Sequence, residues 1–199
     1  MRPRIGVLAL QGDVAEHEAA LRRAGAAPVR VRDTAALETL DGLVIPGGES
    51  TTIGALAEEA GLTVAIRQFV ESGRPVWGTC AGLILLARDV GAAQPLAGGL
   101  DVAVNRNAFG RQVNSFETDL RIPLIGERPF RGIFIRAPSV SATGPGVEVI
   151  ASLEDGTVVA VRQGRVLGTA FHPELSGDDR IHEMFVEWVG ERRETAAAT

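Results

Sequence analysis

Short apolar runs alternate with longer amphipathic segments over the first half of the chain. The run at residues 5–10 ends before Gly12, a pattern typical of a strand buried on both faces of a parallel sheet. Asp13, with Glu16 three residues later, predicts the capped start of a helix that ends at Gly25. We expect further strands at 28–31, 43–45 and 75–77, a helix at 50–73 that is capped by Ser50 or Thr51 and broken near Gly61, and another helix from residue 83.

The pattern changes near residue 98, where strand-like runs follow one another without long helices between them. Gly156 and the pair Gln163-Gly164 are typical of hairpin turns, which join antiparallel strands. The last element is helical, because its apolar residues fall at i, i+3, i+4, i+7 and i+8 from Ile181. The strands expected in this half are at 100–104, 116–122, 132–135, 147–150, 157–161 and 165–171.

These patterns predict an α/β protein with a central, mostly parallel sheet and additional antiparallel strands in the second half. The chain contains no linker, internal repeat or low-complexity segment. We therefore expect a single domain over residues 1–199, in which the polar, alanine-rich residues 191–199 fray.

The composition excludes several kinds of chemistry. The 199 residues include one cysteine, no tyrosine and no lysine, so all 20 basic residues are arginine. An internal disulfide, a CxxC redox pair, a cysteine-rich zinc site and a Schiff-base lysine are therefore excluded. The net charge of −5 argues against a nucleic-acid partner, and no apolar run approaches the length of a membrane span. The N-terminal apolar run is too short for a signal peptide, so we expect a soluble, cytoplasmic protein.

The single cysteine lies between a predicted strand and a predicted helix. Cys80 stands in Gly78-Thr79-Cys80-Ala81-Gly82, the cysteine form of the G-x-S-x-G nucleophile elbow. Glycines two residues before and two after the nucleophile leave room for the neighbouring chain at this sharp turn. The N-terminus of the helix that follows favours the thiolate, so we interpret Cys80 as a nucleophile rather than an inert buried cysteine.

A thiolate of this kind needs a base, and one histidine has a suitable neighbour. His172 and Glu174 flank Pro173 just after a predicted strand, and residues i and i+2 of an extended segment face the same side. Glu174 would hold the imidazole in one tautomer and stabilise its charged form. His17 and His182 lie in predicted helices without comparable neighbours, and we assign them no role in catalysis. We find no metal-ligand spacing and expect no metal.

A glycine turn follows the predicted strand at 43–45, and it is a candidate ligand site. In open α/β sheets, ligands bind at the carboxyl ends of the strands, where Gly47 and Gly48 would bring backbone N–H groups close to a substrate. These groups, with the N–H of Ala81 after the nucleophile, are candidates for an oxyanion hole. The alternative is a tight turn with Ser50 as a helix cap.

The segments together resemble a known family. The elbow and His172-Pro173-Glu174 are similar to the Cys–His–Glu triad of class I glutamine amidotransferases. The whole chain, with its segments in order, resembles the glutaminase subunits of pyridoxal 5′-phosphate synthases. The segments that carry the narrower resemblance are 10–12, 46–52, 106–112, 134–138 and 171–175.

The resemblance implies a three-layer, flavodoxin-like fold and hydrolysis of L-glutamine to glutamate and ammonia through a thioester on Cys80. The ammonia would pass to a partner synthase subunit that makes pyridoxal phosphate, and this chain would need no cofactor. The residues that match glutamine-binding positions of the family are Gly48, Glu49, Ser50, Arg106, Ile135 and Arg136.

Several alternatives remain open at the level of the sequence. The chain could be the glutaminase of another class I amidotransferase, such as that of histidine biosynthesis, or a different cysteine hydrolase with a related elbow. It could be an inactive glutamine-binding scaffold, although the intact Cys80, His172 and Glu174 argue against this. A redox-sensing cysteine is the fourth alternative, and it predicts activity that survives loss of His172.

Overall fold

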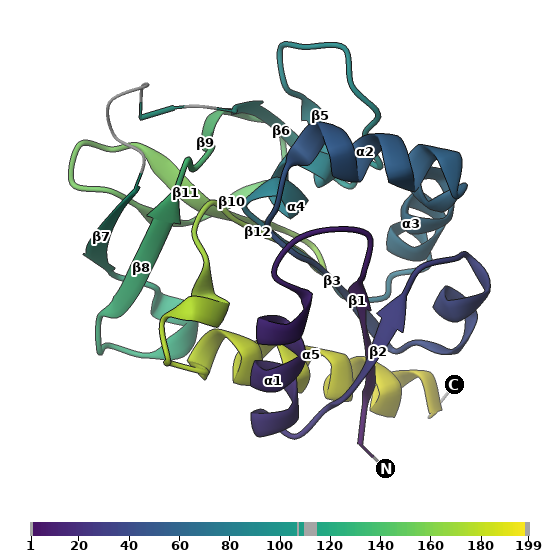
Figure 1. The fold of residues 1–199 in the computed structure, drawn as a ribbon. Helices are drawn as coiled ribbons and strands as arrows, with labels where there is room; N and C mark the ends of the chain where they lie inside the picture. The colour runs from purple at the N-terminus through teal and green to yellow at the C-terminus, as the bar shows by residue number, and fades with distance from the viewer. Residues whose placement is uncertain (1, 107, 110–114, 198–199) are drawn as a thin grey trace.

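The computed structural model of the chain describes residues 2–106, 108–109 and 115–197, and it confirms the predicted α/β class. A ten-stranded sheet runs through the molecule, with nine strands in the order β2-β1-β3-β4-β12-β11-β9-β6-β5 and β10 paired with β11 (Figure 1). The strands are β1 (Arg4–Leu8), β2 (Ala27–Val31), β3 (Gly42–Ile45), β4 (Val76–Thr79), β5 (Ala87–Asp89), β6 (Leu100–Asn105), β9 (Ser139–Thr143), β10 (Glu148–Ser152), β11 (Val158–Gln163) and β12 (Val166–Thr169).

The sheet has two parts that follow the change of pattern in the sequence. From β2 to β12 each neighbouring pair is parallel, whereas β12–β11, β11–β9, β9–β6 and β10–β11 are antiparallel. The hairpins expected at Gly156 and Gly164 are confirmed, with φ of 87° and 57°. A separate antiparallel pair, β7 (Ser115–Leu120) and β8 (Phe130–Ile135), lies beside the main sheet.

Helices cover the two faces of the parallel part. Figure 1 shows α1 and α5 together on one side and α2, α3 and α4 on the other, which gives the three layers. Gly61, with φ of 69°, separates α2 from α3 as expected. The helices are α1 (Val14–Arg23), α2 (Ser50–Glu59), α3 (Leu62–Glu71), α4 (Ala81–Leu86) and α5 (Arg180–Ala197), with short 3₁₀ turns η1 (Ala35–Thr39), η2 (Pro123–Ile125) and η3 (Pro173–Leu175).

The helix starts differ from the sequence predictions in ways that bear on function. Asp13 occupies the N-cap position of α1 but its side chain makes no capping hydrogen bond. Glu49, rather than Ser50 or Thr51, caps α2 by accepting from the N–H groups of Thr51 and Thr52. A carboxylate with two oxygens can reach two N–H groups of the first turn, which a hydroxyl cannot do as well.

Several element bounds and one strand differ from the sequence predictions. The helix expected from residue 83 begins at Ala81 and ends at Leu86, where the chain turns into β5. Strand β9 was not predicted, because its residues Ser139, Ser141 and Thr143 give a mostly polar pattern. Residues 191–197, which we expected to fray, form the end of α5. None of the helices in the described residues is long and apolar enough to span a bilayer.

Candidate active site

Four neighbouring parallel strands, β1, β3, β4 and β12, end at one edge of the sheet. The carboxyl ends of parallel strands meet, so the segments that follow them converge although they lie far apart in the sequence. A pocket of about 450 Å³ opens at this edge. It is lined by Asp13, Gly48, Glu49, Ser50, Cys80, Ala81, Ile84, Arg106, Ile135, Arg136 and His172.

Cys80 lies at the sharp turn from β4 into α4, with φ of 47° and ψ of −102°. Among the described non-glycine residues only Cys80 and Arg136 have positive φ, and both line the pocket. The predicted need for two glycines is confirmed, because a Cβ on Gly78 would overlap the backbone of Gly82, and a Cβ on Gly82 would overlap Ile45 O. Such strained backbone is characteristic of nucleophile elbows.

His172 and Glu174 contact each other as the sequence predicts. The Nδ1 atom of His172 lies 2.8 Å from Glu174 Oε1, and both side chains are almost fully buried. The backbone conformation that brings the two side chains together differs from the expected one, because Glu174 belongs to the turn η3 rather than to an extended segment. The N–H of His172 donates to Ile133 O at 2.8 Å, which ties the histidine to β8.

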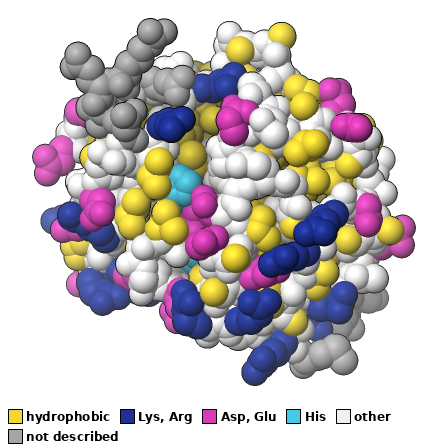
Figure 2. Space-filling model, in the orientation of Figure 1, with side chains coloured by type: hydrophobic (Ala, Val, Ile, Leu, Met, Phe, Trp, Pro, Cys, Tyr) yellow, Lys and Arg dark blue, Asp and Glu magenta, His cyan; other side chains and the backbone are white. Residues whose placement is uncertain are grey.

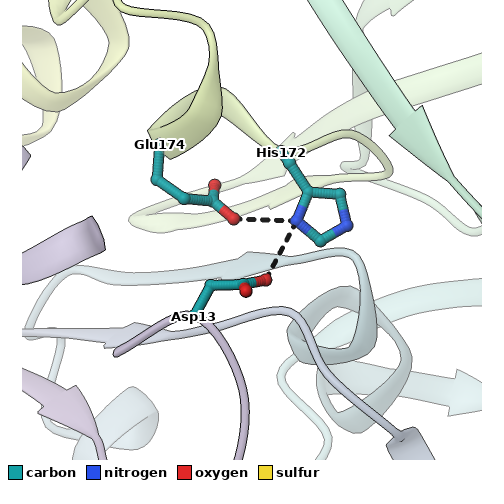
Figure 3. Close-up of side chains that lie close together, drawn as sticks. All are labelled: Asp13, His172 and Glu174. Carbon is teal, nitrogen blue, oxygen red and sulfur yellow. Dashed lines mark hydrogen bonds and ion pairs between the residues drawn. The ribbon is translucent and has the colours of Figure 1, made fainter. Parts of the chain in front are cut away.

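Asp13 supplies a second carboxylate that sequence reasoning missed. Its Oδ2 atom lies 3.2 Å from His172 Nδ1, so two acids approach the same ring nitrogen while the other nitrogen points away from both (Figure 3). Asp13 is about one third exposed, whereas the Glu174 side chain is fully buried. The capping pattern explained Asp13 locally, and only the pairing of β1 with β3 brings it to the site.

The imidazole of His172 is held in its charged form. Burial opposes the charge, but the hydrogen bonds with Asp13, Cys80 and Glu174 together raise the pKa of His172 to about 12. Burial raises the pKa of Glu174, and the hydrogen bond from His172 opposes this shift. Cys80 and His172 both line the pocket. The geometry therefore suits a thiolate–imidazolium pair.

An acidic and a basic residue at the rim of the pocket bring opposite charges close together. Hydrogen bonds from Thr51 and Thr52 lower the pKa of Glu49 to about 2, so its carboxylate is ionised. Arg106 Nη2 lies 3.8 Å from Glu49 Oε1. Arg136 follows β8 directly, beside the 40% exposed Ile135. Figure 2 shows histidine side-chain surface in a hollow, with hydrophobic and acidic side chains beside it.

The turn after β3 is held by the loop after β1. Gln11 Oε1 accepts a hydrogen bond from the N–H of Glu49 at 2.7 Å, and the N–H of Asp13 donates to Gly47 O at 3.2 Å. Ala81 is the first residue of α4, so its N–H has no partner in the helix ladder. The oxyanion-hole assignment of Gly47, Gly48 and Ala81 stays a prediction.

The pocket brings together almost all the residues predicted for the site. Gly47 and Glu174 are the exceptions, since Gly47 lies close against the His172 ring and Glu174 lies behind His172. Within the segment 106–112, residues 107 and 110–112 lie outside the described residues. Ligand atoms of Asp13, His172 and Glu174 lie within 4.8 Å of one another, but they converge on the N–H of His172, and the prediction of no metal stays a prediction.

Comparison with known proteins identifies the family of the chain. The sequence profile of the SNO glutamine amidotransferase family matches residues 7–191. The chain belongs to this family. The SNO family membership confirms the class of enzyme expected from the elbow and from His172-Pro173-Glu174.

Sequence similarity to curated proteins extends over nearly the whole chain. A "Pyridoxal 5'-phosphate synthase subunit PdxT" of Parafrankia sp. is 58% identical over 190 residues, which cover 94% of this chain and 93% of that protein. The protein of the same name from Herpetosiphon aurantiacus is 52% identical over 186 residues, covering 92% and 98%. A crystal structure described as a glutamine amidotransferase has a TM-score of 0.88, 51% identity, and coverage of 94% and 98%.

A more distant structure supports the fold alone. A putative GMP synthase subunit from Thermoplasma acidophilum has a TM-score of 0.73 at 18% identity, and the match covers 99% of this chain and 98% of that one. The class I amidotransferase fold that the sequence resemblance implied is therefore confirmed for this member of the SNO family.

Proposed function

We propose that this glutamine amidotransferase hydrolyses L-glutamine with Cys80, His172 and Glu174, and that it passes the ammonia to a pyridoxal 5′-phosphate synthase subunit. The observation that carries the proposal is a thiol at a strained elbow that lines one pocket with an imidazole, and this imidazole is bonded to a buried carboxylate. The three side chains have the roles of nucleophile, acid–base group and orienting acid that acyl transfer requires.

The reaction follows from these positions. The Cys80 thiolate attacks the carbon of the substrate's side-chain amide, and the negative charge moves to the oxygen. Backbone N–H groups of Ala81 and the Gly47-Gly48 turn stabilise this oxyanion. His172 then gives its proton to the departing nitrogen, which leaves as ammonia, and a thioester remains. His172 next takes a proton from water, whose oxygen attacks the thioester, and glutamate leaves as Cys80 recovers its thiolate.

The charges at the rim suit the amino-acid end of glutamine. An ionised Glu49 attracts the substrate's α-ammonium group, and the guanidinium of Arg106 or Arg136 attracts its α-carboxylate. The backbone at Gly48, Ser50 and Ile135 completes the lining. This arrangement selects a free amino acid over an amide within a peptide, because a peptide lacks both charges.

The partner follows from what this chain lacks. The relatives are named as subunits of a synthase, and a chain without lysine cannot form the imines that building a pyridoxal ring from sugar phosphates requires. A second subunit must carry that chemistry. A cytoplasmic location is part of the proposal, and the biosynthetic role named for the relatives supports it.

The proposed function is tested by measuring ammonia release from glutamine with and without the synthase subunit. We expect glutamate and ammonia in equal amounts, and faster release in the complex. If ammonia were released with the synthase of histidine biosynthesis but not with the pyridoxal phosphate synthase subunit, the protein would be the glutaminase of histidine biosynthesis instead.

Replacing each of the two acids beside His172 by its amide tests which of them belongs to the triad. We expect Glu174→Gln to lower kcat about 10²–10⁴-fold, because an amide cannot compensate the charge of the imidazolium in a buried site. Asp13→Asn should lower kcat less than about 10-fold, because water can replace its partly exposed oxygen. Rate measurements at saturating glutamine decide this, and the reverse order would make Asp13 the orienting acid.

A further inference from the structure

A pair of buried histidines lies behind the Glu174 carboxylate, on the side away from the pocket. His17 comes from α1 and His182 from α5, and both are 0% exposed. Their rings meet, with 3.0 Å between Nδ1 of His17 and Nε2 of His182. These are the two histidines to which the sequence pattern gave no role, and the mechanism above does not use them.

The His17 ring reaches the triad acid directly. Its Nε2 atom lies 3.3 Å from Glu174 Oε2 and 3.1 Å from the hydroxyl oxygen of Thr79, the residue before Cys80. His172 engages the other carboxylate oxygen, Oε1. In the described part of the chain Oε2 makes no well-aligned hydrogen bond of its own, although the Glu174 side chain is fully buried. A buried carboxylate oxygen needs a donor, and His17 offers the ring nitrogen next to it.

Burial disfavours the charged form of both histidines of the pair. Burial, then the nearby His182 and His172, lower the pKa of His17 well below its usual value. Burial lowers the pKa of His182 to about 4, although Asp179 opposes this shift. Asp179 itself is held by Arg23 through two hydrogen bonds. A neutral imidazole carries one N–H, so the position of that proton decides what the ring can do.

Two features favour the proton on Nε2 of His17. The N–H then lies at hydrogen-bond distance from Thr79 Oγ1, with Glu174 Oε2 3.3 Å from the same nitrogen, whereas the other tautomer would turn a lone pair toward the carboxylate. Nδ1 of His17 then accepts from the Nε2–H of His182. This leaves the buried Nδ1 of His182, which has no partner in the described residues, as an acceptor rather than as an unpaired N–H, and an unpaired donor is the less tolerated of the two.

We propose that His17, oriented by His182, is a positioning residue that donates its Nε2–H toward Glu174 and thereby fixes the acid that orients His172 during glutamine hydrolysis. This inference rests on the Cys80–His172–Glu174 triad of the proposed function. It extends the line of contacts from the pocket through Glu174 to two helices on the far side of the sheet. His17 touches neither substrate nor sulfur, so its effect is on the rate of the chemical steps.

The test compares two amide replacements in the complex with the synthase subunit. The Asn amide of His17→Asn lies where Nδ1 was, so it keeps the contact with His182 but cannot reach Glu174. The amide of His17→Gln extends to the position of Nε2 and can donate there. We expect His17→Asn to lower kcat about 10–100-fold with KM changed less than about twofold. The kcat of His17→Gln should be at least about fivefold higher than that of His17→Asn.

The pH profile gives a second readout that a purely structural role would not move. A carboxylate that loses a donor is harder to ionise, so the acidic limb of the kcat/KM profile should shift to higher pH in His17→Asn and return in His17→Gln. Phe185→Leu is the matched control, because Phe185 is buried on the same helix as His182 and packs on Trp77. It should lower stability and leave kcat and the profile unchanged.

The unmodified protein provides a measurement that needs no variant to fold. With only three histidines in the chain, ¹⁵N-histidine labelling gives three rings to assign by NMR. We expect His17 as the neutral Nε2–H tautomer from pH 5 to 8. A proton on Nδ1 of His17 overturns the inference, and so does a kcat of His17→Asn within twofold of the parent. Activity that survives both Cys80→Ala and His172→Asn would instead overturn the triad itself.

Discussion

Replacing Cys80 by alanine is expected to lower glutamine hydrolysis at least about 10³-fold, to the background of the assay. A thioester needs a sulfur nucleophile, and Cys80 is the only cysteine of the chain. Binding of glutamine and docking on the synthase subunit should persist, because the charged rim at Glu49 and Arg106 remains. Ammonia release and isothermal titration with glutamine check the two expectations separately.

Cys80→Ala is also expected to keep its fold. Alanine at φ of 47° carries the same Cβ as cysteine, so the strain of the elbow is unchanged. Cys80→Ser supplies a matched variant with a nucleophile of much higher pKa, and it should be nearly as slow. Substantial ammonia release by either variant would remove Cys80 from the mechanism and would favour a scaffold or sensor role for this cysteine.

Gly82→Ala is expected to be the most destabilising single substitution near the site, costing at least about 4 kcal/mol of the free energy of unfolding. The added Cβ would overlap the carbonyl oxygen of Ile45, which belongs to the backbone of the central strand β3 and cannot rotate away. Relief requires α4 or β3 to move, and either movement separates Cys80 from the glycine turn. In a domain of this size the melting temperature should fall by about 8–16 °C.

Gly190→Ala is the control for the glycine substitution. Gly190 lies in α5, and a Cβ there meets no atom within 4 Å, so alanine should leave stability unchanged or raise it by up to about 1 kcal/mol. Thermal unfolding of the two variants under the same conditions gives the comparison. Equal melting temperatures would mean that the elbow does not need its glycine for close packing against β3.

The sequence predicts the parts of the molecule whose signals are local. The uniformly apolar run before Gly12 and the glycines around Cys80 report backbone positions that few other residues tolerate, and both predictions are confirmed. His172 and Glu174 are two residues apart, so their contact depends on little beyond the turn between them. Gly156 and Gly164 mark hairpins for the same reason.

The contributions of Asp13, His17 and His182 are not predictable in this way. Asp13 satisfies a capping pattern, and nothing near it in the chain indicates that β1 will lie beside β3 and bring its carboxylate to His172. His17 and His182 are 165 residues apart, and each sits on a helix whose neighbours do not mark it out. Their meeting depends on the packing of α1 against α5, which only the complete fold defines.

The position of β12 between β4 and β11 has a consequence for how the protein is made. Four strands, β1 to β4, can assemble early on the ribosome, but the open edge of β4 waits for a strand that is synthesised roughly 90 residues later, about 5–20 s at usual rates of translation. During that time Val76 and Trp77 are paired with β3 on one side and have no strand neighbour on the other, which leaves an exposed, apolar strand edge. His172 follows β12 in the chain, so the nascent protein gains this histidine and the final strand of its parallel sheet at nearly the same time. The proposed triad is therefore complete only late in folding.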